Sequence, residues 1–175
     1  GANPIVAADV NSYLLGEAAA LAKREALDGY IEFRPGDATQ LPFADNRFDR
    51  TISCTVMEEG DADRMLSEFV RVTKPGGKVG SVTRSTDLPR WVNLPLSGQL
   101  KAKVDCAALF SANVTDKGCA DASLYRRMVQ AGLADVAMLP SWASHNSGER
   151  LAYLHDRIVA QLSAEELAEW QSAHE

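Results

Sequence analysis

Short apolar runs that alternate with helical patterns constrain the fold more than any other feature of this sequence. The apolar runs lie at residues 5–8, 30–33, 48–54 and 78–83. Helical spacing of apolar residues predicts one helix from Asn11 or Ser12 to about Leu27, and a second that Asp61 caps. Strands that alternate with helices of this length indicate βαβ units. We therefore predict an α/β fold, with a mainly parallel sheet and helices on both of its faces.

The second half of the chain, residues 84–175, is less regular, and Pro89, Pro95 and Gly98 interrupt its start. We expect a loop-rich segment with a short helix, then a helix over about 120–132 with Leu124, Tyr125, Met128 and Val129 on one face. A strand over 134–139 and a helix through Leu151, Leu154, Ile158 and Leu162 follow, and a capping box at Ser163 opens a terminal helix. With no convincing linker in the sequence, we predict a single domain over residues 1–175.

Composition excludes several classes of protein. The 18 Lys and Arg residues against 24 Asp and Glu give a formal net charge of −6, which disfavours nucleic-acid or membrane-surface binding. No apolar run approaches the length of a transmembrane helix. The three cysteines are an odd number and show no zinc-site spacing. We therefore expect a cytoplasmic protein with no metal site, no nucleic acid and no membrane among its partners.

The residues that follow each strand are the first candidates for a functional site, because ligands of open α/β sheets bind beyond the carboxyl ends of the strands. Asp9 ends the first apolar run and is followed by Val10. A carboxylate in this place can accept hydrogen bonds from the two vicinal hydroxyls of a ribose. The alternative is a plain turn or helix-start residue.

Two longer segments carry a family resemblance. Residues 36–49, GDATQLPFADNRFD, and residues 71–79, RVTKPGGKV, together resemble the class I S-adenosylmethionine-dependent methyltransferases, in particular their small-molecule branch. The resemblance implies a Rossmann-like methyltransferase fold, and it is clear over residues 5–83. It also implies that Asp37 accepts a hydrogen bond from the adenine amine and that Ala38 lies against the adenine. The alternative interpretation of Asp37 is a capping residue in a structural turn.

The end of the third strand is the remaining part of the implied cofactor site. The resemblance places the backbone near Cys54 and Thr55 against the methionine part of the cofactor. Many relatives have a histidine near the position of Glu58 or Glu59, and this sequence has two acids there. Either glutamate is a conceivable general base, but adjacent acids before a helix are more often a solvated helix start. We assign no catalytic residue.

Other residues on the same side of the predicted sheet have an ordinary structural alternative. Arg84, Asp87, Arg90 and Trp91 follow the fourth strand and could contact a substrate carboxylate or ring, or form loop salt bridges around a packing tryptophan. We expect His145 to be a surface histidine. Cys106 and Cys119 are expected to be inert packing residues.

The family's glycine-rich loop is absent, because only eight residues precede Asp9. Such a loop precedes the acidic residue by roughly 20 residues in dinucleotide-binding relatives. The resemblance thus implies that the first βα unit is missing, and with it a central strand between the strands that end at Asp9 and Cys54. Either an N-terminal part is not in this sequence, which we favour, or another chain supplies a strand, or the two halves close on each other.

The function implied by the resemblance is methyl transfer from S-adenosylmethionine to a small-molecule acceptor, by a chain that is a fragment of the complete enzyme. A non-catalytic module that keeps the fold for binding or assembly is the alternative, and the lack of the loop favours it. The acceptor, any general base and the oligomeric state, a homodimer included, stay open.

Overall fold

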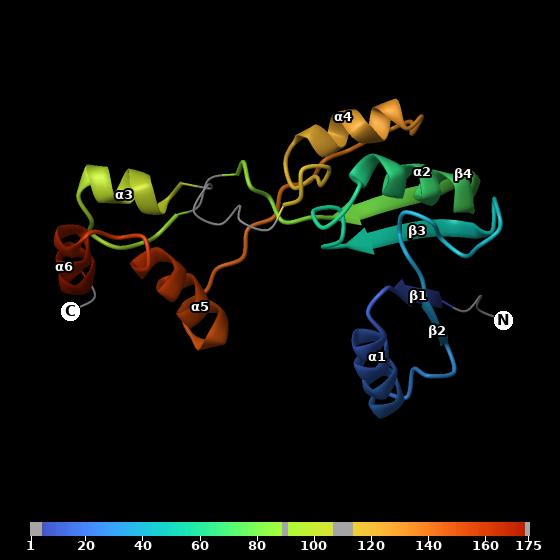
Figure 1. Cartoon of the computed structure of the whole chain (residues 1–175), viewed down its shortest axis with the longest axis horizontal. Coiled ribbons are helices and arrows are strands. Elements are labelled where there is room, and N and C mark those ends of the chain that lie inside the picture. The colour runs from blue at the N-terminus through green and yellow to red at the C-terminus, as the bar shows by residue number, and fades with distance from the viewer. Residues whose placement is uncertain (1–4, 89–90, 107–113, 174–175) are drawn as a thin grey trace.

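The computed structural model describes residues 5–88, 91–106 and 114–173. Strands and helices alternate through the first half of this part and give way to helices in the second, which confirms the predicted α/β class (Figure 1). Their bounds are β1 Ile5–Asp9, α1 Ser12–Arg24, β2 Ile31–Pro35, β3 Phe48–Cys54, α2 Ala62–Val72, β4 Thr73–Val82, α3 Gly98–Val104, α4 Ser123–Gln130, α5 Gly148–Val159 and α6 Ala164–Ser172.

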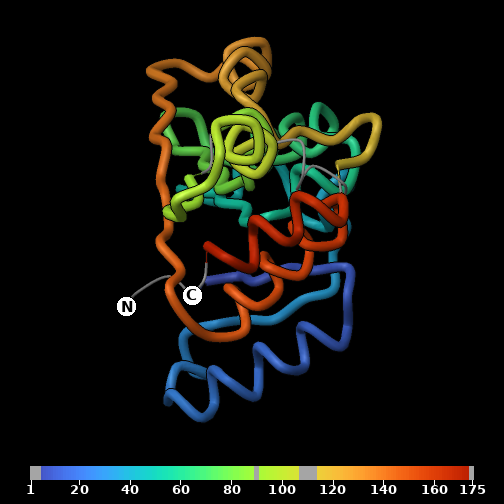
Figure 2. The backbone as a smooth tube through the Cα atoms, turned by 90° about the vertical axis from the view of Figure 1, so that its left-hand side faces the viewer, coloured from blue at the N-terminus to red at the C-terminus, as the bar shows by residue number. Residues whose placement is uncertain are grey.

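The four strands form two separate parallel pairs. β1 pairs with β2 from Ile5↔Ile31 to Asp9↔Pro35, and β3 pairs with β4 up to Cys54↔Val82. The parallel direction is confirmed, but within the described residues no strand joins β1 to β3, so the predicted single sheet is divided. Figures 1 and 2 show the β1–β2 pair with α1 on one side of the molecule and the β3–β4 pair with α2 and α4 on the other.

The first helix has the predicted start but loses much of its predicted core face. The side chain of Asn11 caps α1 and accepts hydrogen bonds from the N–H groups of Tyr13 and Leu14. Ala22 is buried, whereas the side chains of Leu14 and Leu21 are about half exposed. Because α1 packs mainly on the narrow β1–β2 pair, part of its apolar face stays exposed.

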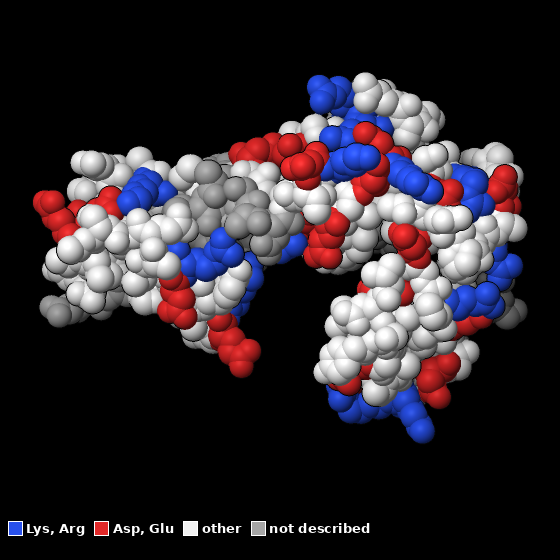
Figure 3. All heavy atoms as spheres, in the orientation of Figure 1, with Lys and Arg blue, Asp and Glu red and all other residues white. Residues whose placement is uncertain are grey.

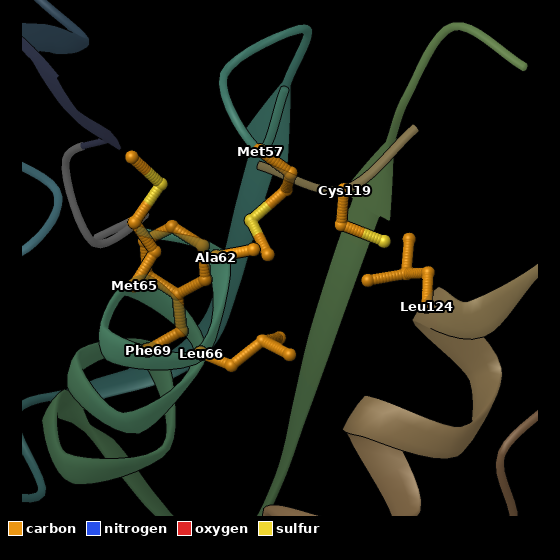
Figure 4. Close-up of a cluster of buried hydrophobic side chains, with 7 residues drawn as sticks. All are labelled: Met57, Ala62, Met65, Leu66, Phe69, Cys119 and Leu124. Carbon is orange, nitrogen blue, oxygen red and sulfur yellow. The ribbon is translucent and has the colours of Figure 1, made fainter. Parts of the chain in front are cut away.

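The second helix, in contrast, buries the face that the sequence predicts. Asp61 caps α2 through the N–H of Arg64, 3.1 Å away. The apolar side of α2 packs on β3 and β4 and on α4. The resulting core cluster, drawn in Figure 4, consists of Met57, Ala62, Met65, Leu66, Phe69, Cys119 and Leu124.

The C-terminal helices build a second core and correct two predictions. α3, α5 and α6 bury Leu100, Val104, Ile158 and Trp170 together, and both hydrogen bonds of the predicted capping box at Ser163 are present. On α4 Leu124 of the predicted face is buried and Met128 packs against the core cluster, whereas Tyr125 and Val129 are about half exposed. The strand predicted over 134–139 is wrong: Asp135 has a left-handed backbone (φ 52°), and Leu139 is 89% exposed.

The glycines before Lys78 form a bulge inside β4. Phe48 pairs with Thr73 and Arg50 with Lys78, so residues 74–77 are looped out of the ladder. Gly76 has a φ of 77°, which is easy only for glycine. A Cβ on Gly77 would lie 2.6 Å from the Thr73 side chain and 2.7 Å from the Asp49 carbonyl oxygen. The bulge therefore needs glycine at both positions.

We predict that Gly77→Ala destabilises the protein by about 2 kcal/mol, because the new methyl group meets backbone that cannot move aside. Gly29→Ala is the matched control, since a Cβ on Gly29 would have no other atom within 4 Å. It should change the free energy of unfolding by less than about 0.5 kcal/mol. Urea denaturation measures both, and equal effects would show that the close approach at Gly77 does not matter.

Candidate functional site

Asp9 and the loop that contains Asp37 are neighbours at the carboxyl end of the β1–β2 pair. The N–H of Gly36 donates to the carbonyl oxygen of Asp9, 3.0 Å away. One carboxylate oxygen of Asp9 accepts from the N–H of Asn11, which makes Asp9 a helix-start residue as well. Val10, beside it, is 73% exposed. The predicted ribose-binding and adenine-binding residues thus share one strand edge.

Asp37 presents an exposed carboxylate that is fixed in place. Its Oδ1 accepts hydrogen bonds from the hydroxyl and the N–H of Thr39, both at 2.7 Å. These bonds, the side-chain one first, lower the pKa of Asp37 below its ordinary value, so the group is ionised at neutral pH. Its Oδ2 has no partner among the described residues. Ala38 is half-buried and packs against the core cluster.

The 37–45 loop is held down by three side chains on one polar face of α2. Arg64, Glu68 and Arg71 lie four and three residues apart, so they share this face. Arg64 donates to the carbonyl of Thr39, and Glu68 accepts from the N–H of Leu41. None of these three residues is among the predicted site residues, and the spacing of their charges, opposite the apolar face of α2, is the sequence signal that marks them.

Arg71 makes the largest share of these bonds. Its guanidinium donates to the carbonyls of Leu41 and Phe43 and to the carboxylate of Asp45. It also forms a two-bond pair with Glu68, with Nε to Oε1 and Nη2 to Oε2 both at 2.7 Å. The hydrogen bonds from Arg71 lower the pKa of Glu68, and those to Glu68 and Asp45 raise the pKa of Arg71. Each nitrogen of this guanidinium thus donates either to Glu68 on the same helix or to the 37–45 loop.

The end of β3 has an unusual backbone. Thr55 adopts a φ of 53°, and its N–H donates to the carbonyl of Val82 at the end of β4, 2.7 Å away. A left-handed conformation costs a β-branched residue on the order of 1–3 kcal/mol and is often found at functional sites. Cys54 is exposed beside it. The structure thus brings Asp9, Val10, Asp37 and Ala38 to one edge and Cys54 and Thr55 to another, and the two edges belong to different strand pairs.

The two glutamates after β3 differ sharply. Glu59 is 67% exposed by side chain, whereas Glu58 is 1% exposed. The interpretation of both residues as a solvated helix start is therefore wrong for Glu58. Its Oε1 accepts from the backbone N–H and the Nε of Arg84. Parallel strands bring Glu58 and Arg84 together because each follows the carboxyl end of its strand.

The other residues after β4 have mostly structural roles. Asp87 accepts from the N–H of Ala122 and the hydroxyl of Ser85, and these bonds lower its pKa. Arg90 lies outside the described residues. Trp91 is exposed and its ring lies 5.6 Å from that of Trp142. His145 is exposed as predicted, and Cys119 is buried, but Cys106 is exposed rather than packed.

Three observations concern other kinds of site. Over residues 5–88, 91–106 and 114–173, no three His, Cys, Asp or Glu side chains are grouped to hold a metal. None of the described helices combines the length and apolarity needed to cross a bilayer. A surface pocket of about 270 Å³ lies between α2 and α4, and none of the predicted site residues lines it.

Residues 1–80 match the family model described as a methyltransferase domain. Of the solved structures, the [4+2]-cyclase SpnF is 26% identical with a TM-score of 0.52, covering 75% of this chain and 43% of that one. The order of parallel strands and helices agrees with these matches. Over residues 1–80 the chain is therefore similar to a methyltransferase domain, and its α/β fold is of the Rossmann-like kind.

The curated relatives narrow the resemblance. A demethylmenaquinone methyltransferase of Paenarthrobacter aurescens is 35% identical over 134 residues, which are 74% of this chain and 51% of the relative. A ubiquinone/menaquinone biosynthesis C-methyltransferase of Bdellovibrio bacteriovorus is 38% identical over 101 residues, 57% of this chain and 40% of the relative. The chain is thus similar to small-molecule methyltransferases and spans about half their length or less.

We predict that Arg71→Lys lowers the midpoint of thermal unfolding by roughly 5 °C and speeds hydrogen exchange at the Leu41 N–H. Lysine keeps the charge but cannot make the two-bond pair with Glu68 and reach the loop carbonyls at once. Arg24→Lys changes an exposed ion pair and should leave both measurements unchanged. Equal exchange at Leu41 in the two variants would show that Arg71 does not hold the 37–45 loop in place.

Glu68 gives a prediction for the dependence of stability on pH. Because folding lowers the pKa of Glu68 below its ordinary 4.5, its contribution is present above that value and is lost as pH falls through the lowered pKa. Glu68→Gln should therefore cost about 1–2 kcal/mol at pH 7, and the difference from wild type should shrink below about pH 4. Chemical denaturation over pH 3–8 measures it, and a gap independent of pH would sink the idea.

Proposed function

We propose that this chain is part of an enzyme that transfers the methyl group of S-adenosylmethionine to a carbon atom of a small aromatic acceptor of the quinol type. The names of the curated relatives support the reaction and the acceptor class. The observation that carries the proposal is the 37–45 loop, which α2 holds so that the ionised Asp37 faces outward beside Asp9. The proposed setting is the cytoplasm, with a small molecule as the partner and a homodimer left open.

The residues at the β1–β2 edge fit the adenosine part of S-adenosylmethionine. Oδ2 of Asp37 can accept from the adenine amine, with Ala38 against the ring, and Asp9 with its neighbour Val10 can meet the ribose hydroxyls. We assign Cys54 and Thr55 to the methionine part. When bound, the cofactor supplies an electrophilic methyl carbon, whose bond to sulfur breaks with its electron pair as the acceptor forms the new bond. The chain's residues then act mainly by holding donor and acceptor in line.

A non-catalytic or differently reacting module is the second candidate. The separation of β1 and β3 favours it, because the two edges of the proposed cofactor site do not meet. The solved structure that is 26% identical also favours this candidate, since it is described as a [4+2]-cyclase. Such a protein would keep the fold and the 37–45 loop without transferring a methyl group.

We predict that the protein expressed from its complete coding sequence binds S-adenosylhomocysteine, and that Asp37→Asn weakens binding at least tenfold. Asparagine keeps the shape of Asp37 but has no negative charge, and only one of its two terminal side-chain atoms is an acceptor oxygen. Asp28→Asn, an exposed change elsewhere, is the control and should bind as wild type does. Isothermal titration calorimetry measures the three proteins.

The same preparations separate the two candidates. An enzyme should transfer tritium-labelled methyl to a short-chain 2-prenyl-1,4-naphthoquinol, with the Asp37→Asn variant slower at subsaturating cofactor. Binding without transfer to this acceptor would favour the module. Absence of binding by wild type would contradict the proposed enzyme.

A further inference from the structure

Glu58 is held rigidly at the carboxyl end of β3 by its backbone. Its carbonyl oxygen accepts from the N–H of Thr115, 3.0 Å away, and the carbonyl of Met57 before it accepts from the N–H of Cys119. A Cβ on Gly118 would lie 2.3 Å from the carbonyl oxygen of Glu58, so the two segments touch. The backbone of Glu58 is therefore held in place, and its side chain is buried, at 1% exposure.

The buried carboxylate of Glu58 holds Arg84 in place but occupies only one of the five N–H donors of the Arg84 guanidinium. Both bonds from Arg84, from its backbone N–H and its Nε, go to the single oxygen Oε1 of Glu58, at 3.2 and 3.1 Å. Oε2 has no hydrogen-bond partner among the described residues. A guanidinium carries five N–H donors, and the four on its Nη atoms make no hydrogen bond within the described part of the chain. Nη2 forms a longer ion pair with the exposed Glu59, 3.8 Å away.

Arg71 provides the comparison within the same molecule. It pairs with Glu68 through two parallel bonds and donates its remaining N–H groups to the loop, so its role is structural. Arg84 has one Nε bond, a side chain that is 48% exposed, and unused Nη donors at the edge where β3 and β4 end. The Nη donors of Arg71 are thus all engaged by the protein, whereas those of Arg84 are available to a ligand.

The guanidinium of Arg84 faces Glu58 and Glu59, and α5 carries further basic side chains beside a tyrosine. Tyr153 on α5 accepts from Arg157, and the guanidinium of Arg150 lies 5.2 Å from the centre of its ring. The hydrogen bond from Arg157 comes first in lowering the pKa of Tyr153, and the charges of Arg150 and Arg84 add to it. In the view of Figure 3, acidic and basic side chains are mixed over the surface. The ring of Tyr153 thus lies beside the guanidinium groups of Arg150 and Arg157.

We propose that Arg84, positioned by Glu58, binds an anionic oxygen of the methyl acceptor, which makes the acceptor an aromatic anion such as a phenolate or a carboxylate. The planar fork of the Nη atoms suits either group. That the bound anion is the methyl acceptor rests on the proposed function. An ionised ring hydroxyl, its proton given to water, raises the electron density of the ring carbon that forms the new carbon–carbon bond. That carbon then loses its own proton to water.

The test is a binding measurement that does not need turnover. The protein from the complete coding sequence, saturated with S-adenosylhomocysteine, is titrated with 1-naphthoate, with the ionised 2,4-dinitro-1-naphtholate, and with neutral 1-naphthalenemethanol. We expect wild type to bind one or both anions at least tenfold more tightly than the alcohol. The anion that binds more tightly distinguishes a carboxylate from a phenolate.

The variants assign this preference to Arg84. In Arg84→Gln the ratio of anion affinity to alcohol affinity should fall at least tenfold, while the affinity for S-adenosylhomocysteine stays within twofold of wild type. Arg84→Lys should recover part of that ratio. Glutamine keeps a donor for Glu58, and thermal unfolding checks that the variant folds. Arg126→Gln, an exposed change on α4, should behave as wild type does.

Each outcome decides the point. An anion preference that survives Arg84→Gln, or no preference in wild type, overturns the inference. Loss of the preference in that variant together with methyl transfer by wild type supports it in full. If wild type shows the Arg84-dependent preference but transfers no methyl group, the anion site stands and the proposed function fails.

Discussion

The packing of α2 is the constraint on which the rest of the described structure depends. One face of this helix is apolar and builds the core cluster with β3, β4 and α4. The adjoining polar face carries Arg64, Glu68 and Arg71, which hold the 37–45 loop. A single helix therefore stabilises the larger strand pair and also shapes the loop on which cofactor binding is proposed to depend. Charge-assisted bonds of this kind are worth more than exposed ion pairs, because several donors converge on partly buried acceptors.

The sequence could predict the elements whose signals are local. The caps at Asn11, Asp61 and Ser163 and the strand over 48–54 are confirmed, since a cap or an apolar run needs only its own neighbours. The strand over 134–139 failed for the opposite reason: a strand needs a partner, and no strand pairs with these residues in the described part of the chain. The burial of Glu58 could not be predicted, because it depends on Arg84, 26 residues away, and on the segment around Gly118. The assigned cofactor residues stay predictions.

The two strand pairs show what their separation does to the rest of the fold. Ile52 on β3 is 75% exposed and Ile5 on β1 is 63% exposed, and the apolar face of α1 is partly uncovered. Two-stranded pairs are marginal alone, so these surfaces favour additional packing. Of the three alternatives from the sequence, direct closure of the halves is not what the structure shows, since β1 and β3 do not pair. The remaining alternatives are a strand from another part of this protein and a strand from another chain.

The contrast between Arg71 and Arg84 gives a physical way to separate structural from functional guanidinium groups. Both lie near a partly or fully buried glutamate, so the presence of an ion pair does not distinguish them. What distinguishes them is the number of N–H donors that form hydrogen bonds within the protein. A guanidinium whose donors all meet loop carbonyls and carboxylates can be exchanged only at a cost in stability. One that is fixed through Nε alone keeps a rigid, half-exposed fork, because a buried carboxylate at 1% exposure prevents it from swinging away. Rigid positioning before the ligand arrives lowers the entropy lost on binding, and this is the property that an acceptor-binding residue needs.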